Sequence, residues 1–285
     1  MKSILNSFLI AVIFIMSANA QITKPSLSPK ISKSTQIGLA NVALEYGQPS
    51  ANDRTIFGAL IPYGKLWRTG ANASTKFSTD RDIIINKQHV PAGAYALYTI
   101  PNIDTWTIVI HKNTKLWGAG NYDAKDDLVR FDVSAINTKD YQETLDIHFE
   151  GFHADGGHMV IAWEHTKVSI PIHVDSNALI MAEIKEKLIN AKGEIKAQTY
   201  FDAAQYYYHK NVDLEQATQW FDKAVEMRPS AFWFIYYRAE LAHTMQQNIL
   251  ALKLVNQALD MAKKSPSGDY GYIAKCELLK VQIEK

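Results

Sequence analysis

This 285-residue sequence has a single cysteine and almost no net charge. The first excludes a protein held together by internal disulfides, and the second argues against a protein that binds nucleic acid or an anionic membrane. Cys276 is the only cysteine, so no disulfide can form within the chain. Its surroundings, IAKCELLKV, are apolar and contain no histidine, which predicts a buried and unreactive thiol. The 30 basic residues are balanced by 29 acids, and a formal net charge of +1 provides no basic excess for nucleic acid or an anionic membrane.

Long hydrophobic runs are missing except at the N-terminus, in MKSILNSFLIAVIFIMSANA. Lys2 precedes an apolar run from Phe8 to Met16, and Ala18-Asn19-Ala20 supplies the small-x-small pattern that signal peptidase cuts. The run is too short for a membrane span of about 20 residues. We therefore predict a signal peptide over 1–20, cleavage near Ala20/Gln21, and a soluble periplasmic or secreted protein with no membrane span.

Hydrophobic periodicity divides the remaining sequence into two parts. A linker over 21–34, rich in Pro, Ser and Lys, precedes segments such as WTIVIH, LDIHF and KVSIPIHV, in which apolar residues recur with a period of two. From Asp175 onward the apolar period is helical. We predict an α+β multidomain chain, with an antiparallel β-sandwich or jelly-roll-like domain over 35–175 and an all-α domain over 176–285.

The helical part repeats itself. Three residues recur after 34 positions, Ala217, Phe221 and Ala224 matching Ala251, Val255 and Ala258. This interval resembles the tetratricopeptide repeat, in which small residues let paired helices approach closely. The resemblance covers about 198–264, although Ala204 and Gln205 replace the Leu-Gly pair of the repeat signature. Because two units are marginal alone, we expect the helix before them and the helix over 270–284 to act as caps.

Four segments of the β part carry a second resemblance. They are RTIFGALIPYGKLWRTGANAST from Arg54, VPAGAYALYTIP from Val90, WTIVIHK from Trp106 and LWGAGNYDAKDDLVRFDV from Leu116. These segments resemble an exported bacterial family known only as domain of unknown function 2911 (DUF2911). The resemblance implies export and a β domain, sometimes followed by helical repeats. It implies no reaction, because the family has none assigned.

The segment YGKLWRTGANAST, over 63–75, is the first candidate site. We predict a ligand cradle here. Trp67 would supply a flat ring and Arg68 a planar cation, and Gly70 would let the backbone approach the ligand closely. Asn72 and Thr75 would orient the ligand through hydrogen bonds. The alternative is a structural loop with an Asx turn. The segment contains no acid, cysteine or histidine, so it suits recognition better than chemistry.

Aromatic and histidine residues suggest further ligands for the β part. Trp67 and Trp117 stand in glycine-rich surroundings and are candidates for stacking on a sugar, with Asp123 nearby as a polar contact, whereas Trp106 and Trp163 alternate with isoleucines and are predicted to be core. The segment HFEGFHADGGH holds His148, His153 and His158, but their spacing matches no known metal motif. We therefore predict neither a metal nor another cofactor.

The repeat part offers a candidate surface for a partner. The first helix of each repeat unit should line a concave face, as in other helical repeats. The predicted residues are Thr199, Asp202, Tyr206, His209, Lys210, Trp233, Tyr236, Glu240, His243 and Thr244. Aromatic anchors mixed with polar groups are typical of a surface that binds an envelope protein or peptide. In the alternative interpretation, Trp233 and Tyr236 are buried against a neighbouring helix or the β domain.

No assembled catalytic motif accompanies these surfaces. Gly-x-Ser-x-Gly, a phosphate loop and paired zinc ligands are all missing from the sequence. Our leading hypothesis is a periplasmic binding or scaffold protein, in which the repeats hold a protein partner and the β domain a second ligand, a glycan being one candidate. The alternative is a hydrolase of envelope or polymeric glycans, with Asp123, Asp126 or a histidine-bound metal supplying the chemistry.

Overall fold

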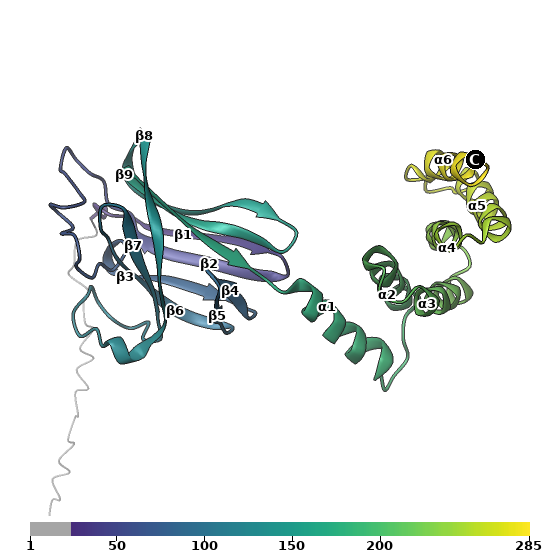
Figure 1. Cartoon of the computed structure of the whole chain (residues 1–285), viewed down its shortest axis with the longest axis horizontal. Helices are drawn as coiled ribbons and strands as arrows, with labels where there is room; N and C mark the ends of the chain where they lie inside the picture. Colours follow the sequence, from purple (N-terminus) through teal and green to yellow (C-terminus); the bar gives the residue numbers. More distant parts are fainter. Residues whose placement is uncertain (1–23) are drawn as a thin grey trace, which may run out of the picture. The chain divides into compact units, whose positions relative to one another are not determined.

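The computed structural model describes residues 24–285 and divides into two compact units between Val174 and Asp175 (Figure 1). The first contains an antiparallel sheet and the second contains helices, so the predicted α+β class is confirmed. The predicted signal peptide over 1–20 lies outside the described residues. No helix within 24–285 is long and apolar enough to cross a membrane.

The β unit is one antiparallel sheet of 9 strands within the described residues. The strands are β1 (Lys30–Ile37), β2 (Ala40–Gly47), β3 (Ala71–Thr79), β4 (Ile83–Ile85), β5 (Gln88–Val90), β6 (Gly93–Ile100), β7 (Thr105–His111), β8 (Asp127–His153) and β9 (Gly156–His173). Their spatial order is β1-β2-β3-β6-β7-β8-β9-β4-β5. The chain leaves β3 for the far end of the sheet, where Ile84 on β4 pairs with His173 on β9.

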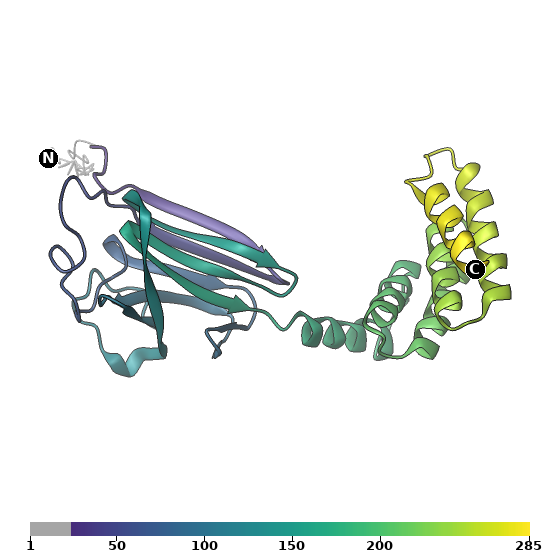
Figure 2. The same cartoon turned by 45° about the horizontal axis from the view of Figure 1, so that its top comes forward.

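The long strand β8 bends this sheet over itself. Its first part, as far as Ser134, pairs with β7, and the part from Ala135 onward pairs with β9, with a register shift between Asn137 and Gln142. The β8–β9 hairpin consequently lies alongside β1 and β2, which are not its neighbours in the strand order (Figure 2). A hydrogen bond of 3.1 Å from the Ile147 backbone N–H to the Tyr46 hydroxyl joins the two layers. The inner side chains of both layers form the core.

The start of β1 corrects the predicted linker over 21–34. β1 begins at Lys30, and its side chains alternate between exposed and half-buried positions. It is an edge strand paired only with β2 among the described strands. Serine, threonine and lysine fill the exposed face of such a strand without breaking its period of two, so its composition resembles that of a linker.

The helical unit consists of two helical hairpins with helices on either side. Its elements are α1 (Ser176–Ile184), the π-helical turn η2 (Lys185–Ile189), α2 (Ala197–Lys210), α3 (Leu214–Met227), α4 (Phe232–Thr244), α5 (Asn248–Lys263) and α6 (Tyr272–Ile283). The repeated small residues Ala217 and Ala251 are fully buried in the hairpins α2–α3 and α4–α5. Phe201 stacks on Phe234 with ring centroids 4.2 Å apart and connects the two hairpins. The tetratricopeptide-like organisation is therefore confirmed.

Cys276 on α6 is completely buried, as its apolar neighbours predicted. Burial, with a smaller contribution from the negative charges of Glu240 and Glu277, raises the pKa of its thiol to about 11. The thiolate that reacts with electrophiles is therefore scarce at neutral pH.

Candidate functional sites

Trp67 is a core residue, in contrast to the exposed ring that the sequence predicted. Only 7% of its surface is exposed, and its ring stacks on Trp163 at 6.0 Å and meets Trp106 edge-on at 6.1 Å. Its indole N–H donates to the carbonyl of Gly70 over 3.2 Å. Burying this ring against the two core tryptophans removes a large apolar surface from water, so the glycine-containing loop folds inward.

The other predicted cradle residues support the loop itself. The Thr75 hydroxyl donates to the carbonyl of Thr69 over 2.7 Å, and a Cβ at Gly70 would lie 3.0 Å from the carbonyl oxygen of Gly47. Asn72 adopts a left-handed φ of 64° and its side-chain amide donates to the carbonyl of Ser28. Asn72 and Thr75 thus make hydrogen bonds that support the first half of β3, and Gly70 allows the close approach of Gly47 just before it.

Arg68 is the residue of this loop that keeps unused hydrogen-bonding capacity. Its Nε–H is buried and donates to no atom of the described chain. A Cβ at Gly118 would lie 4.0 Å from its Nη1, so the guanidinium lies beside the loop that carries Trp117. Trp117 is 73% exposed and stays available for the predicted sugar contact. An arginine with a free N–H next to an exposed ring can recognise an oxyanion.

Asp123 is used structurally. Its carboxylate caps the short helix η1 (Ala124–Asp126) by accepting from the Lys125 N–H over 3.0 Å, and its carbonyl lies 3.1 Å from Nε2 of His111. Three of the predicted cradle residues, Trp67, Arg68 and Gly70, line a cavity of about 320 Å³ together with residues that include Arg54 and Trp163. Arg54 is already engaged with the carbonyls of the preceding turn.

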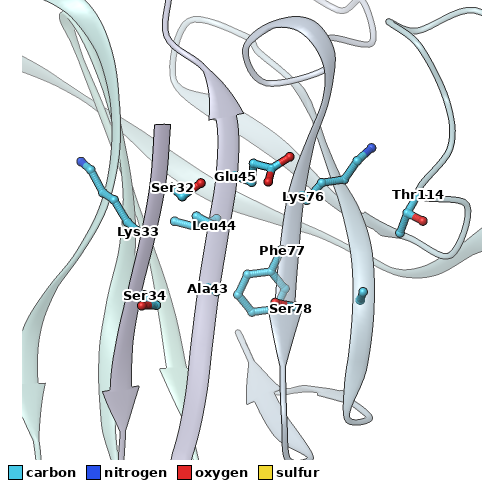
Figure 3. A pocket seen from close by; sticks show the side chains of 11 residues that line it. Ser32, Lys33, Ser34, Ala43, Leu44, Glu45, Lys76, Phe77, Ser78 and Thr114 are labelled. Carbon is cyan, nitrogen blue, oxygen red and sulfur yellow. The ribbon is translucent and has the colours of Figure 1, made fainter. Parts of the chain in front are cut away.

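A larger cavity of about 540 Å³ lies over strands β1, β2, β3 and β6 (Figure 3). Small hydroxyl side chains line it, including Ser32, Ser34 and Thr114, together with the cross-strand neighbours Glu45 and Lys76. Partial burial lowers the pKa of Lys76, while the negative charge of Glu45 acts in the opposite direction. This cavity was not predicted from the sequence, because isolated polar residues on alternating strand positions normally face solvent.

His148 on β8 lies between two carboxylates. Its Nδ1 is 2.7 Å from Oδ2 of Asp146, and its Nε2 is 3.3 Å from Oε2 of Glu150. Each carboxylate has a lysine of its own, because Lys33 pairs with Asp146 and Lys167 lies 2.8 Å from Glu150. Within residues 24–285, no three His, Cys, Asp or Glu side chains are placed to hold a metal ion.

The residues named for a hydrolase lie on separate elements. Asp126 belongs to η1, and His153 lies at the β8–β9 turn. Neither residue has a hydrogen bond or ion pair with Arg68 in the described part of the chain.

The predicted partner residues of the helical unit fall into separate neighbourhoods. Thr199 and Asp202 line a cavity of about 280 Å³ together with both apolar and charged residues of α1 and η2. The Tyr206 hydroxyl donates to the side-chain oxygen of Asn177 on α1. Lys210 is exposed at the end of α2. Helix α1 and turn η2 thus cover much of the face that α2 was predicted to present to a partner.

Trp233 and His243 have local roles on α4. Trp233 is half-buried, and the guanidinium of Arg228 lies 4.9 Å from its ring centroid. Nδ1 of His243 is 3.1 Å from the side-chain oxygen of Asn248 at the turn into α5.

A tyrosine–glutamate cluster forms where α2, α4 and α6 meet. Its members are Tyr208, Tyr236, Tyr237, Tyr272 and Glu240. The Tyr236 ring lies 5.4 Å from Tyr237 and 5.3 Å from Tyr272, and the Tyr208 hydroxyl lies 3.3 Å from that of Thr244. Tyr236 is itself buried, as the alternative interpretation of the sequence proposed, while Tyr208, Tyr237, Tyr272 and Glu240 remain half-buried.

Glu240 is the acidic residue of the cluster, and its carboxyl affects the pKa values of its neighbours. Burial raises the pKa of its carboxyl, against the hydrogen bond from Tyr236 and the nearby positive charges of His209 and Lys275. Burial raises the pKa of Tyr236 and Tyr272 above the ordinary tyrosine value, with a further contribution from Glu240 for Tyr236 and from Tyr237 and Glu240 for Tyr272. The phenols of Tyr208, Tyr236 and Tyr272, whose pKa values are all raised, therefore stay protonated at neutral pH and can donate hydrogen bonds.

The sequence predicted three residues in or beside this cluster and missed the others. His209, Tyr236 and Glu240 belong to the predicted set, whereas Tyr208, Tyr237, Tyr272 and Lys275 do not. Tyr272 and Lys275 were missed because the loop between α5 and α6 is longer than the repeat period allows. Helix α6 therefore does not follow the 34-residue spacing of the earlier helices. Treating α6 as the first helix of a third, displaced unit would have identified them.

A comparison with known protein families gives a match for the β unit. Residues 28–172 match the model of a family described as a protein of unknown function (DUF2911), which contains the four segments quoted above. No curated protein matches the chain. One similar solved structure is the solution NMR structure of a tetratricopeptide repeat domain protein from Salinibacter ruber, at 19% identity over 31% of this chain and 87% of that chain, with a TM-score of 0.29.

Proposed function

We propose that this chain, which belongs to the DUF2911 family of proteins of unknown function, is an exported scaffold whose helical unit binds a segment of a partner protein. The observation that carries the proposal is the tyrosine–glutamate cluster. Three helices supply its side chains, and four of its five members are half-buried and thus reachable from solvent. Helical repeats commonly bind partners on the surface formed by successive helices.

The composition of the cluster favours a protein ligand. Tyrosine is enriched at the energetically dominant positions of protein interfaces, because it buries a large apolar ring and keeps a hydroxyl for hydrogen bonding. Several of these side chains are already fixed before any partner binds. The Thr244 hydroxyl donates to the carbonyl of Glu240 over 3.1 Å and also contacts Tyr208. Such preorganisation lowers the entropy lost on binding.

The β unit supplies a second recognition surface in this proposal, formed by Arg68 and the loop that holds Trp117. The unpartnered Nε–H of Arg68 supports an oxyanion ligand there, and the exposed ring of Trp117 adds an apolar face. Within residues 24–285, neither Asp126 nor His153 forms a hydrogen bond or ion pair with Arg68, and this supports binding over the hydrolase alternative.

Affinity capture tests the proposal for the helical unit. The immobilised protein would be exposed to envelope extract beside a Tyr237→Ala variant, which removes a cluster ring, and a Tyr270→Ala variant, which removes a 70% exposed tyrosine outside the cluster. Circular dichroism and thermal melts would verify that both variants fold. We expect a protein partner that the parent chain and Tyr270→Ala retain and that Tyr237→Ala loses. Equal retention by all three chains, or capture of no protein, would contradict the proposal.

A further inference from the structure

We propose that the tyrosine–glutamate cluster binds the cationic side chain of a lysine or arginine in the partner segment. This inference rests on the proposed function and specifies the chemistry that the helical unit recognises. Three observations carry it: a half-buried carboxylate without a cationic partner, the tyrosine rings around it, and an ammonium group already held at the edge of the cluster.

The carboxylate of Glu240 has unused capacity. Oε1 accepts one hydrogen bond, from the Tyr236 hydroxyl over 2.5 Å, and Oε2 accepts none from the described residues. Among the ion pairs of residues 24–285, none includes Glu240. A carboxylate withdrawn from water carries a desolvation cost unless a cation or several hydrogen bonds compensate it. A cation brought by a partner would provide that compensation.

The rings next to Glu240 suit a cation as well. Aromatic faces carry negative electrostatic potential and attract ammonium and guanidinium groups within about 6 Å of the ring centroid. Tyr236 and Tyr237 lie on α4 with Glu240, and Tyr272 faces them from α6. His209 on α2 lies edge-on to Tyr237, with ring centroids 6.1 Å apart. Carboxylate and rings from neighbouring helices thus surround the same position.

Lys275 shows that this environment accommodates an ammonium group. Its Nζ lies 4.5 Å from the ring centroid of Tyr272, and its charge acts on Glu240 without forming an ion pair with it. Lys275 is exposed on α6, so its ammonium remains largely hydrated. The stronger site, at Oε2 of Glu240, is left for an external cation.

Other side chains fit this position less well. An acidic side chain would meet the carboxylate of Glu240 directly, and repulsion between like charges would oppose it. An apolar side chain would cover the carboxylate and leave Oε2 buried without a partner. A lysine or arginine satisfies Oε2 and gains cation–π contact at the same time.

Fluorescence anisotropy with labelled peptides tests the inference on the full chain. The probes are tetralysine, tetraarginine, tetralysine acetylated on every side chain, and tetraglutamate. We expect one or both basic peptides to bind, and the acetylated peptide to bind at least tenfold more weakly. Binding of the acetylated peptide with equal affinity, or no binding by either basic peptide, would overturn the inference.

A pair of variants separates this site from general attraction to surface acids. Glu240→Gln removes the charge and keeps an oxygen that can accept the Tyr236 hydroxyl. Glu215→Gln removes an exposed charge at the start of α3 and serves as the matched control. We expect Glu240→Gln to weaken basic-peptide binding about tenfold, as for loss of a charge-assisted contact, with Glu215→Gln unchanged. Equal affinities of the two variants would contradict the inference.

The two proposals fail in distinguishable ways. Loss of the captured partner in Tyr237→Ala but full retention in Glu240→Gln would preserve the scaffold function and overturn cation recognition. Retention of the partner by Tyr237→Ala would overturn the scaffold function itself. Melting temperatures of both variants would verify that the helical unit is intact in each case.

Discussion

The hydroxyl of Tyr236 donates a 2.5 Å hydrogen bond to Oε1 of Glu240, one turn further along α4. This bond fixes the carboxylate between helices α2, α4 and α6, where burial raises its pKa. The same carboxylate lies close to the phenols of both neighbouring helices. The helical unit therefore holds a charge that folding alone does not require, because a glutamine would make the same hydrogen bond with Tyr236.

The raised pKa of Glu240 predicts how stability changes with pH. A carboxyl whose folded pKa exceeds its unfolded pKa contributes stability below the unfolded value, and that contribution is lost as pH rises through the folded value. We therefore expect Glu240→Gln to match the parent chain near pH 4 and to melt at a higher temperature near pH 8. A lower melting temperature for Glu240→Gln at pH 8 would contradict this expectation.

Other titrating groups face Glu240 from all three helices. They are Tyr208 and His209 on α2, Tyr236 and Tyr237 on α4, and Tyr272, Lys275 and Cys276 on α6. Because these groups are present in both chains, the difference between the two melting curves isolates the contribution of Glu240. Differential scanning calorimetry over this pH range provides the measurement.

The tryptophans of the β unit give a matched pair for stability. Trp67 is buried between Trp106 and Trp163, whereas Trp117 is exposed. We expect Trp67→Ala to reduce the free energy of unfolding of the β unit by about 3–5 kcal/mol and Trp117→Ala to change it by less than about 0.5 kcal/mol. Urea unfolding measures both, and similar values for the two variants would contradict the buried position of Trp67.

Two glycines of the β unit should respond differently to a methyl group. A Cβ at Gly47 would collide with the carbonyl oxygen of Ala71, while a Cβ at Gly120 would meet nothing within 4 Å. We expect Gly47→Ala to destabilise the β unit by about 1–3 kcal/mol through overpacking. Gly120→Ala should be close to neutral. The prediction is wrong if thermal melts show the two variants to be equally stable.

The thiol of Cys276 should react slowly in the folded protein. It is completely buried and its pKa is raised to about 11, so both access and thiolate are limiting. We expect iodoacetamide to label the native chain at less than about a tenth of the rate seen in guanidinium chloride, where access is restored. Rapid labelling of the native chain, followed by mass spectrometry, would show that α6 does not cover this residue.

Large-scale organisation was predictable from the sequence because it depends on periodicity. The change from a period of two to a helical period near Asp175, and the recurrence of Ala217 at Ala251, both follow from which faces must be buried. The linker prediction was wrong at its end, because the edge strand β1 buries only one face. A strand of that kind can be rich in serine, threonine and lysine.

Candidate sites were less predictable because they depend on contacts between distant segments. Trp67 looked exposed beside glycines, but Trp106 and Trp163, far along the chain, complete its packing. Tyr236 and Glu240 followed from helical spacing on α4. Tyr272 did not, because its position against Tyr236 depends on the length of the α5–α6 loop, which no periodicity specifies.

Site-specific photocrosslinking in cells that express the protein tests the central claim most directly. A benzoylphenylalanine placed at Thr244, which is exposed and touches Tyr208, would report on the tyrosine–glutamate cluster, and the same residue placed at Tyr270 would serve as the control. We predict a discrete crosslinked protein adduct from position 244 and none from position 270. Crosslinking at neither position, or equally at both, would contradict a partner-binding role for the cluster.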